Sequence, residues 1–182
     1  MRIVCLWVPH FYIQVEGLET PSLIGKPVVI GGRPEERGSV IDCSPEAASH
    51  GIYPSTPLSQ AYHLCPQASF ILFERERYLE LWEEMLFVLG AFSLRMESDE
   101  CGLARLDMTN NPKIYKSEGA LAASIGREMS HSFGITAKVG IGNSRFTAGQ
   151  AAFHAKDGSL VIEQGRERHF LSSLSVNTLP IR

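Results

Sequence analysis

The sequence predicts an α+β fold: a split βαββαβ core with a mostly antiparallel sheet, and a small α/β unit inserted after the first strand. An apolar run at residues 2–8 indicates a buried strand. Amphipathic segments at residues 74–89 and 117–133 indicate two long helices. The other strands of the core are expected at residues 93–97, 102–108 and 136–141. This order is that of a split βαββαβ unit, and we expect both long helices on one face of its sheet.

The inserted unit is expected at residues 20–73 and is built from short elements. An apolar run at residues 28–30, ended by two glycines, predicts its first strand. A polar hairpin loop then leads to a second strand at residues 39–43. Two short helices follow, each with a proline in its first turn; they begin near Ser44-Pro45 and Thr56-Pro57.

The helix at residues 74–89 has the clearest periodicity in the chain. Its apolar side chains recur at three- and four-residue steps: Tyr78, Leu81, Trp82, Met85, Leu86 and Leu89. The acidic pair Asp99-Glu100 is expected in a turn between two strands. The last elements are expected to be a helix at residues 143–154, a strand at residues 159–162 and a short helix at residues 166–171.

Composition excludes several classes of protein. The 182 residues include 17 Lys+Arg and 20 Asp+Glu, so a net charge of -3 offers no general basic field for nucleic acid. No apolar stretch approaches the ~18 residues of a membrane span, and no signal-peptide pattern is visible. We therefore expect a cytoplasmic protein with no membrane partner. The cysteines lack the paired spacing of a zinc site, which predicts reduced thiols: Cys5, Cys43, Cys65 and Cys101.

Five stretches, in the correct order, resemble the Y-family translesion DNA polymerases. Residues 21–32 (PSLIGKPVVIGG) are similar to a strand motif of that family, and residues 44–52 (SPEAASHGI) to its Tyr-Glu-Ala-Arg helix. Residues 56–66 (TPLSQAYHLCP) are similar to the helix that comes next. Residues 92–109 (FSLRMESDECGLARLDMT) resemble the motif ending Ser-Ile-Asp-Glu-Ala-Tyr-Leu-Asp, and residues 139–158 (VGIGNSRFTAGQAAFHAKDG) the segment beginning Val-Gly-Ile-Ser-x-Asn-Lys.

The resemblance covers nearly the whole chain and implies a domain plan. A βαββαβ core with an insert after its first strand is that of a polymerase palm with a small fingers domain, and such a core is ferredoxin-like. The palm would comprise residues 1–19 and 74–182, and the fingers residues 20–73. In the family, the segment matching residues 170–181 leads into a helical thumb, so we expect a palm-fingers fragment or a truncated relative.

The resemblance also implies where metal ligands would lie. Phosphoryl transfer by polymerases needs two metal ions held by carboxylates in the first strand and a neighbouring hairpin. By the resemblance these positions fall on Trp7, Gly102 and Leu103, and a further acidic position of the first strand falls on Pro9. None of the four side chains can ligate a hard divalent cation. We therefore expect a degenerate site with no catalytic residue, no metal site and no cofactor.

The pair Asp99-Glu100 leaves an alternative open. A shifted register would bring these carboxylates toward the site and give an active error-prone DNA polymerase that binds Mg²⁺ through displaced ligands. The gapless match through Phe92 and Leu106-Asp107 argues against such a shift. Even after a shift, Trp7 would still occupy the position of the first ligand.

Three residues match nucleotide-binding positions of the family, and a fourth adjoins one of them. Lys156 matches its triphosphate lysine, Arg145 a basic position before the third helix, and Tyr12, next to Phe11, the aromatic gate. We interpret these four as a vestigial nucleotide site. The alternative is structural: Phe11 and Tyr12 as core residues at a helix start, and the two cations as solvated surface charges.

The fingers helix lacks its phosphate contacts, because the family's Tyr and Arg fall on Pro45 and Ala48. The chain combines a Y-family plan, missing carboxylates and the first-strand sequence Leu6-Trp7-Val8-Pro9. In this it resembles the ImuB-type relatives of UmuC-like polymerases in bacterial SOS mutagenesis. The resemblance implies a pseudoenzyme of DNA repair that brings an active error-prone polymerase and a sliding clamp to damaged or primer-template DNA. That role would belong to the full-length protein, and we expect residues 1–182 alone to bind DNA weakly.

One motif fits another class of protein. Gly140-Ile141-Gly142 follows an expected strand, opens a helix and precedes Glu163 by about twenty residues, as in a dinucleotide-binding fingerprint. However, Arg145 stands where that fingerprint has Gly or Ala, and the element comes late in the chain. The sequence therefore favours the polymerase-like interpretation.

Overall fold

The structure, a computed structural model, describes residues 1–109 and 115–175. It contains two compact units, one of Met1–Pro9 with Trp82–Arg182 and one of His10–Leu81. Both units combine helices and strands, so the predicted α+β class is confirmed. The expected limits of palm and fingers, residues 1–19 with 74–182 and residues 20–73, stay a prediction about functional domains.

The first unit is built on a five-stranded sheet of order β5-β6-β1-β7-β8. The strands are β1 (Ile3–Trp7), β5 (Met96–Glu100), β6 (Leu103–Asp107), β7 (Lys138–Gly142) and β8 (Ser159–Val161). Strand β1 is antiparallel to both β6 and β7, and β5 is antiparallel to β6. Only β8 is parallel to its neighbour, β7. The predicted, mostly antiparallel βαββαβ core is therefore confirmed, and β8 extends it at one edge.

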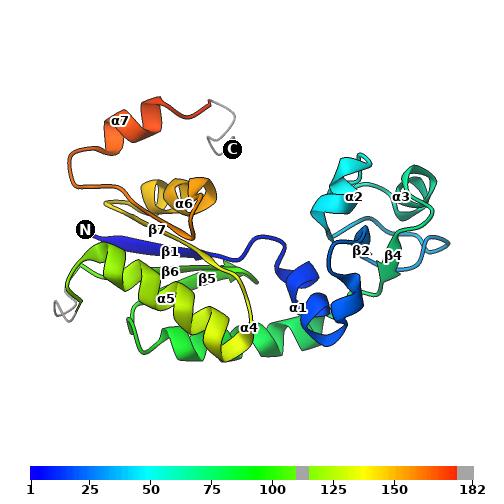
Figure 1. Cartoon of the computed structure of the whole chain (residues 1–182), viewed down its shortest axis with the longest axis horizontal. Coiled ribbons are helices and arrows are strands. Elements are labelled where there is room, and N and C mark those ends of the chain that lie inside the picture. Colours follow the sequence, from blue (N-terminus) through cyan, green and yellow to red (C-terminus); the bar gives the residue numbers. More distant parts are fainter. Residues whose placement is uncertain (110–114, 176–182) are drawn as a thin grey trace. The chain divides into compact units, whose positions relative to one another are not determined.

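Helices lie on both faces of this sheet. Figure 1 shows α5 (Glu118–Phe133) and the part of α4 (Arg75–Leu89) that belongs to this unit on one side, and α6 (Arg145–His154) on the other. The short α7 (Glu167–Ser172) follows β8. Helix α5 buries an apolar stripe of Leu121, Ile125 and Met129. The part of α4 in this unit buries Trp82, Met85 and Leu89. These periodic stripes explain why both long helices were predictable.

Helix α6 lies unusually close to β7. A Cβ atom built on Gly140 would be 2.1 Å from the carbonyl oxygen of Ala148, and one on Gly142 would be 2.8 Å from the Ala148 nitrogen. The glycines that suggested a dinucleotide fingerprint thus allow direct packing of a helix on a strand. Ser144 caps the helix, because its hydroxyl accepts a hydrogen bond from the Thr147 N–H.

The second unit contains a three-stranded sheet of order β3-β2-β4. Its elements are α1 (Phe11–Glu19), the 3₁₀-helix η1 (Pro21–Leu23), β2 (Val28–Ile30), β3 (Asp42–Cys43), α2 (Pro45–Ser49), α3 (Leu58–Leu64) and β4 (Ser69–Ile71). Strand β4, which was not predicted, runs parallel to β2. Buried apolar side chains from β2, α2 and α3 form the core of this unit, among them Val29, Ala47, Leu58 and Ala61.

Two predicted strand positions were wrong. The strand expected at residues 39–43 consists of Asp42–Cys43 alone, while Ser39 forms an isolated bridge to Pro57. The strand expected at residues 93–97 begins at Met96, because Ser93 makes irregular hydrogen bonds with the Arg95 N–H and the Asp107 carbonyl.

Within residues 1–109 and 115–175, none of the helices combines the length and the apolar character that crossing a membrane requires. All four cysteines are free thiols; Cys5, Cys43 and Cys65 are buried and Cys101 is half-buried.

Candidate functional site

Three of the four predicted degenerate positions meet in the first unit. Trp7, the last residue of β1, lies directly opposite Leu103, the first residue of β6. The N–H of Val8 donates a 2.7 Å hydrogen bond to the carbonyl of Gly102. Gly102 makes the turn into β6 with a φ of 85°, a left-handed conformation that favours glycine. Pro9, the fourth position, follows Val8 and is the last residue of the segment Met1–Pro9 in this unit.

The side chains at these positions do not fit a magnesium ion. Mg²⁺ requires oxygen ligands in octahedral geometry, and an indole, a glycine and a leucine supply none from their side chains. Trp7 instead packs against a buried apolar cluster of Ile3, Cys5, Leu103, Ala148 and Ala152. In the part of the chain that the structure describes, no group of three or more His, Cys, Asp or Glu is placed to hold a metal ion.

The indole of Trp7 has two notable neighbours on its own sheet face. The ring of Phe153, near the end of α6, meets it edge to face with a centroid distance of 4.9 Å. Lys138 lies opposite Trp7 on β7, and its ammonium is over the indole, 5.8 Å from the ring centroid. Phe153 is 40% exposed, so this aromatic pair is partly accessible from solvent. Neither Lys138 nor Phe153 was singled out from the sequence.

We expected the Asp99-Glu100 pair in a turn, and this prediction was wrong. Both residues lie within strand β5. The turn comes later, at residues 101–102. Asp99 is 80% exposed and accepts a 2.9 Å hydrogen bond from the guanidinium of Arg105. Glu100 lies opposite Leu103 in the sheet register, so one strand separates it from Trp7.

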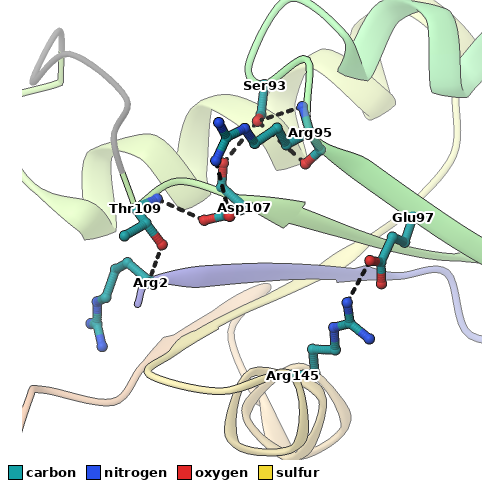
Figure 2. Close-up of polar contacts among 7 residues, drawn as sticks. All are labelled: Arg2, Ser93, Arg95, Glu97, Asp107, Thr109 and Arg145. Atoms are coloured by element: carbon teal, nitrogen blue, oxygen red, sulfur yellow. Dashed lines mark hydrogen bonds and ion pairs between the residues drawn. The ribbon is translucent and has the colours of Figure 1, made fainter.

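Arg145 begins α6 and lines a hollow of about 250 Å³ at the other end of the same face. Figure 2 shows its guanidinium reaching Glu97 of β5, with which it forms an ion pair. Arg95 lies 4.0 Å from the carboxylate of Asp107 in this hollow. Hydrogen bonds from the side chain and backbone of Thr109 lower the pKa of Asp107. The cations here already face carboxylates, which weakens the case for a phosphate site at Arg145.

Lys156 lies in the loop between α6 and β8 and is exposed. That loop is attached to β7, because the Gly158 carbonyl accepts a 2.9 Å hydrogen bond from the Val139 N–H. Val139, which makes this hydrogen bond, follows Lys138 directly in the chain. Of the two cations predicted as nucleotide contacts, Lys156 is therefore the one on the loop next to the Trp7 end of the sheet.

Phe11 and Tyr12 belong to the second unit, at the start of α1. Phe11 is buried, and Tyr12 is half-buried among aromatic rings. Tyr12 meets Phe73 and Tyr78 edge to face, with centroid distances of 5.2 and 4.8 Å. These contacts support the structural alternative for both residues, and they leave a gate function as a prediction.

A polar triad supports this aromatic cluster and was not predicted. The Tyr78 hydroxyl donates a 2.7 Å hydrogen bond to the buried carboxylate of Glu16, which also pairs with Arg77 at 2.8 Å. Burial is the main cause of a raised pKa at Tyr78, and the hydrogen bond to Glu16 adds to it. The only sequence signal was the place of Glu16 on the inward face of α1, which is easily overlooked for a charged residue.

The fold and the ligand positions together define a class. A βαββαβ sheet with the candidate ligand positions at the end of β1 and the start of β6, and a small α/β unit after β1, is the palm-and-fingers part of a polymerase. The chain belongs to the impB/mucB/samB family of Y-family DNA polymerases, whose family model matches residues 6–152. The predicted family is confirmed.

Relatives and solved structures agree with this assignment. DNA polymerase IV of Dehalococcoides mccartyi is 35% identical over 180 residues, which are 98% of this chain and 46% of that protein. DNA polymerase IV of Clostridium perfringens is 30% identical over 176 residues, 96% of this chain and 49% of the relative. The chain therefore spans about half the length of these relatives.

The chain is also similar in structure to solved DNA polymerases. The crystal structure of DinB from Sulfolobus solfataricus matches with a TM-score of 0.90 and 25% identity, over 99% of this chain and 53% of that one. An insertion ternary complex of Dbh DNA polymerase matches with a TM-score of 0.87 and 26% identity, over 99% of this chain and 54% of the other. The predicted palm-and-fingers fold is thereby confirmed.

Proposed function

We propose that this chain is the palm-and-fingers part of a non-catalytic DNA-repair protein of Y-family architecture, similar to the ImuB-type accessory proteins. The single observation that carries the proposal is the meeting of Trp7 and Leu103 across β1 and β6, next to Gly102. These are the positions at which an active relative would hold its metal ions, and here they form an apolar surface.

The proposal assigns roles to the rest of the chain. Residues 1–19 and 74–182 would act as palm and residues 20–73 as fingers. Phe11, Tyr12, Arg145 and Lys156 would be remnants of a nucleotide site, now used for packing or surface charge. The full-length protein would bring an active error-prone polymerase and a sliding clamp to damaged or primer-template DNA, and it would need no metal cofactor.

A second candidate is an active error-prone polymerase with displaced Mg²⁺ ligands. Its support is that the relatives are named DNA polymerase IV and that Glu100 lies only one strand from Trp7. Against it, Asp99 is paired with Arg105, and nothing replaces the carboxylate of the first strand at Trp7.

Primer extension separates the two candidates. The complete protein is incubated with a primer-template, four deoxynucleoside triphosphates and Mg²⁺ or Mn²⁺, with DNA polymerase IV of Dehalococcoides mccartyi as the active control. We expect no extension by this protein. Extension that disappears in the double variant Asp99→Asn, Glu100→Gln would overturn the proposal, and the double variant separates it from a contaminating polymerase.

A further inference from the structure

The Trp7 end of the palm sheet has the components of a stacking site. Trp7 is half-buried, so part of the indole is anchored in the core while part remains accessible. Phe153 holds the indole edge to face at 4.9 Å and is itself 40% exposed. The ammonium of Lys138 lies over the ring at 5.8 Å from its centroid. An anchored aromatic ring beside a lysine is an arrangement that binds single-stranded nucleic acid.

We propose that Trp7 stacks on an unpaired nucleobase of a DNA strand, and that Lys138 binds the phosphate next to that base. The proposal rests on the proposed function in one respect, that DNA is the partner of this face. The cation–π contact at this half-buried ring is weak, so a base can displace the Lys138 ammonium from the accessible part of the indole. The displaced ammonium then gains a phosphate oxygen as its partner.

The charges around Trp7 favour a strand over a free nucleoside triphosphate. Glu100 lies on the same face, across Leu103, and Asp157 follows Lys156 in the adjoining loop. Lys138 and the exposed Lys156 only balance these two carboxylates. This end of the sheet therefore has no net positive charge to hold a ligand with three or four negative charges, whereas one phosphodiester beside Lys138 carries only one. A base pair inside a duplex is excluded as well, because both of its faces are already stacked, and a blunt duplex offers an open face only at its two ends.

The two tryptophans of the chain allow a direct measurement. Trp82 is only 3% exposed and its indole N–H donates a 2.9 Å hydrogen bond to Ser98. In the variant Trp82→Phe of the complete protein, Trp7 becomes the reporter within residues 1–182. We expect saturable quenching of its emission by a twelve-residue oligothymidylate. A blunt duplex and thymidine triphosphate should quench much less at the same base concentration.

Matched variants separate stacking from charge and from folding. With a labelled oligothymidylate, we expect Trp7→Ala to weaken binding roughly tenfold, while Trp7→Phe, which keeps a ring in the core, retains most of the affinity. Lys138→Ala should weaken binding and reduce the slope of log K against log salt by about 0.7. The control is Phe87→Ala, which removes a side chain that is 86% exposed on α4 of the same unit and should leave binding unchanged.

Two outcomes would overturn the inference. One is equal oligothymidylate affinity of the wild type and of Trp7→Ala, with thermal melting showing that both are folded. The other is quenching by thymidine triphosphate as strong as that by the oligonucleotide, which would assign the site to a free nucleotide. Either result leaves the proposed non-catalytic function intact, because that function is tested by primer extension.

Discussion

Gly140 of β7 and Ala148 of α6 are so close that a side chain on Gly140 would place its Cβ 2.1 Å from the Ala148 carbonyl oxygen. This contact lets α6 lie directly on the sheet and brings Phe153, at the far end of the helix, to Trp7. The approach involves backbone atoms on both sides, so a rotamer change cannot relieve it. The position of α6 therefore depends on the absence of a side chain at residue 140.

The first prediction follows from this contact. We expect Gly140→Ala to lower the free energy of unfolding by about 3 kcal/mol, because strand and helix must separate to admit the methyl group. The matched control is Gly126→Ala in α5, where a Cβ meets no atom within 4 Å. That change should raise stability by about 0.5 to 1 kcal/mol, since alanine is the better helix former. Urea unfolding of both variants is the measurement, and a fully stable Gly140→Ala would contradict the contact.

The second prediction concerns the buried carboxylate of Glu16. Tyr78→Phe removes the hydroxyl that donates to it at 2.7 Å and leaves a charged oxygen without that donor. We expect stability to fall by about 1.5 to 3 kcal/mol, the usual range for a hydrogen bond to a charged group. Tyr62→Phe is the control, because Tyr62 is 43% exposed and its loss should cost less than about 0.5 kcal/mol. Equal melting temperatures for the two variants would disprove the role of the triad.

The third prediction concerns thiol reactivity. Burial raises the pKa of Cys5 to about 11 and is also the main cause of a pKa of about 11 at Cys43. Cys65 is buried too, whereas Cys101 is half-buried in a turn. At about pH 8 we expect one thiol to react quickly with a chromogenic disulfide and three to react only after unfolding. In Cys101→Ser the fast phase should disappear, and a fast phase that persists would show that another thiol is accessible.

The fourth prediction concerns pH. A hydrogen bond to Asp42 raises the pKa of His10 above its ordinary value of 6.5. A raised pKa in the folded state means that the stabilisation is fully present below about pH 6.5 and is lost as the pH rises through the folded value. We therefore expect His10→Asn to lose more stability near pH 5.5 than near pH 8.5. Asparagine suits the left-handed backbone of this residue, which has a φ of 50°.

The pairing with Asp42 can be tested separately. Asp42→Asn should give the same pH dependence as His10→Asn, because either change removes the ion pair at 3.2 Å. Denaturant unfolding at several pH values measures both variants. A stability loss for His10→Asn that is independent of pH would assign the effect to the backbone conformation and not to the charge.

Much of the fold was predictable because burial imposes a period on the sequence. The stripe containing Tyr78, Trp82, Met85 and Leu89 identified α4 to within one residue of its observed start. The apolar run of β1 was equally clear, since both faces of that strand are covered. Strand β4, by contrast, has only three half-buried residues and lacks any such pattern.

The sites were less predictable because their members are far apart in the chain. Tyr78 and Glu16 are separated by 62 positions, and no local sequence pattern near either residue predicts that the two are in contact. Lys138 came to Trp7 only through the β1–β7 register, which no local motif specifies. The position of Leu103 opposite Trp7 agrees with what the family motif implied, because that motif carries long-range information that periodicity lacks.

The acidic pair Asp99-Glu100 has a consequence at its observed position in β5 that does not involve a metal ion. Strand β5 is an outer strand of the five-stranded sheet, and its register is irregular between Glu97 and Glu100. An outer strand with free hydrogen-bonding groups tends to recruit a strand from another molecule, and charged side chains and bulges prevent this. We therefore expect the sequence Met-Glu-Ser-Asp-Glu to oppose edge-to-edge pairing with another molecule, whether or not its carboxylates ever bind a metal ion.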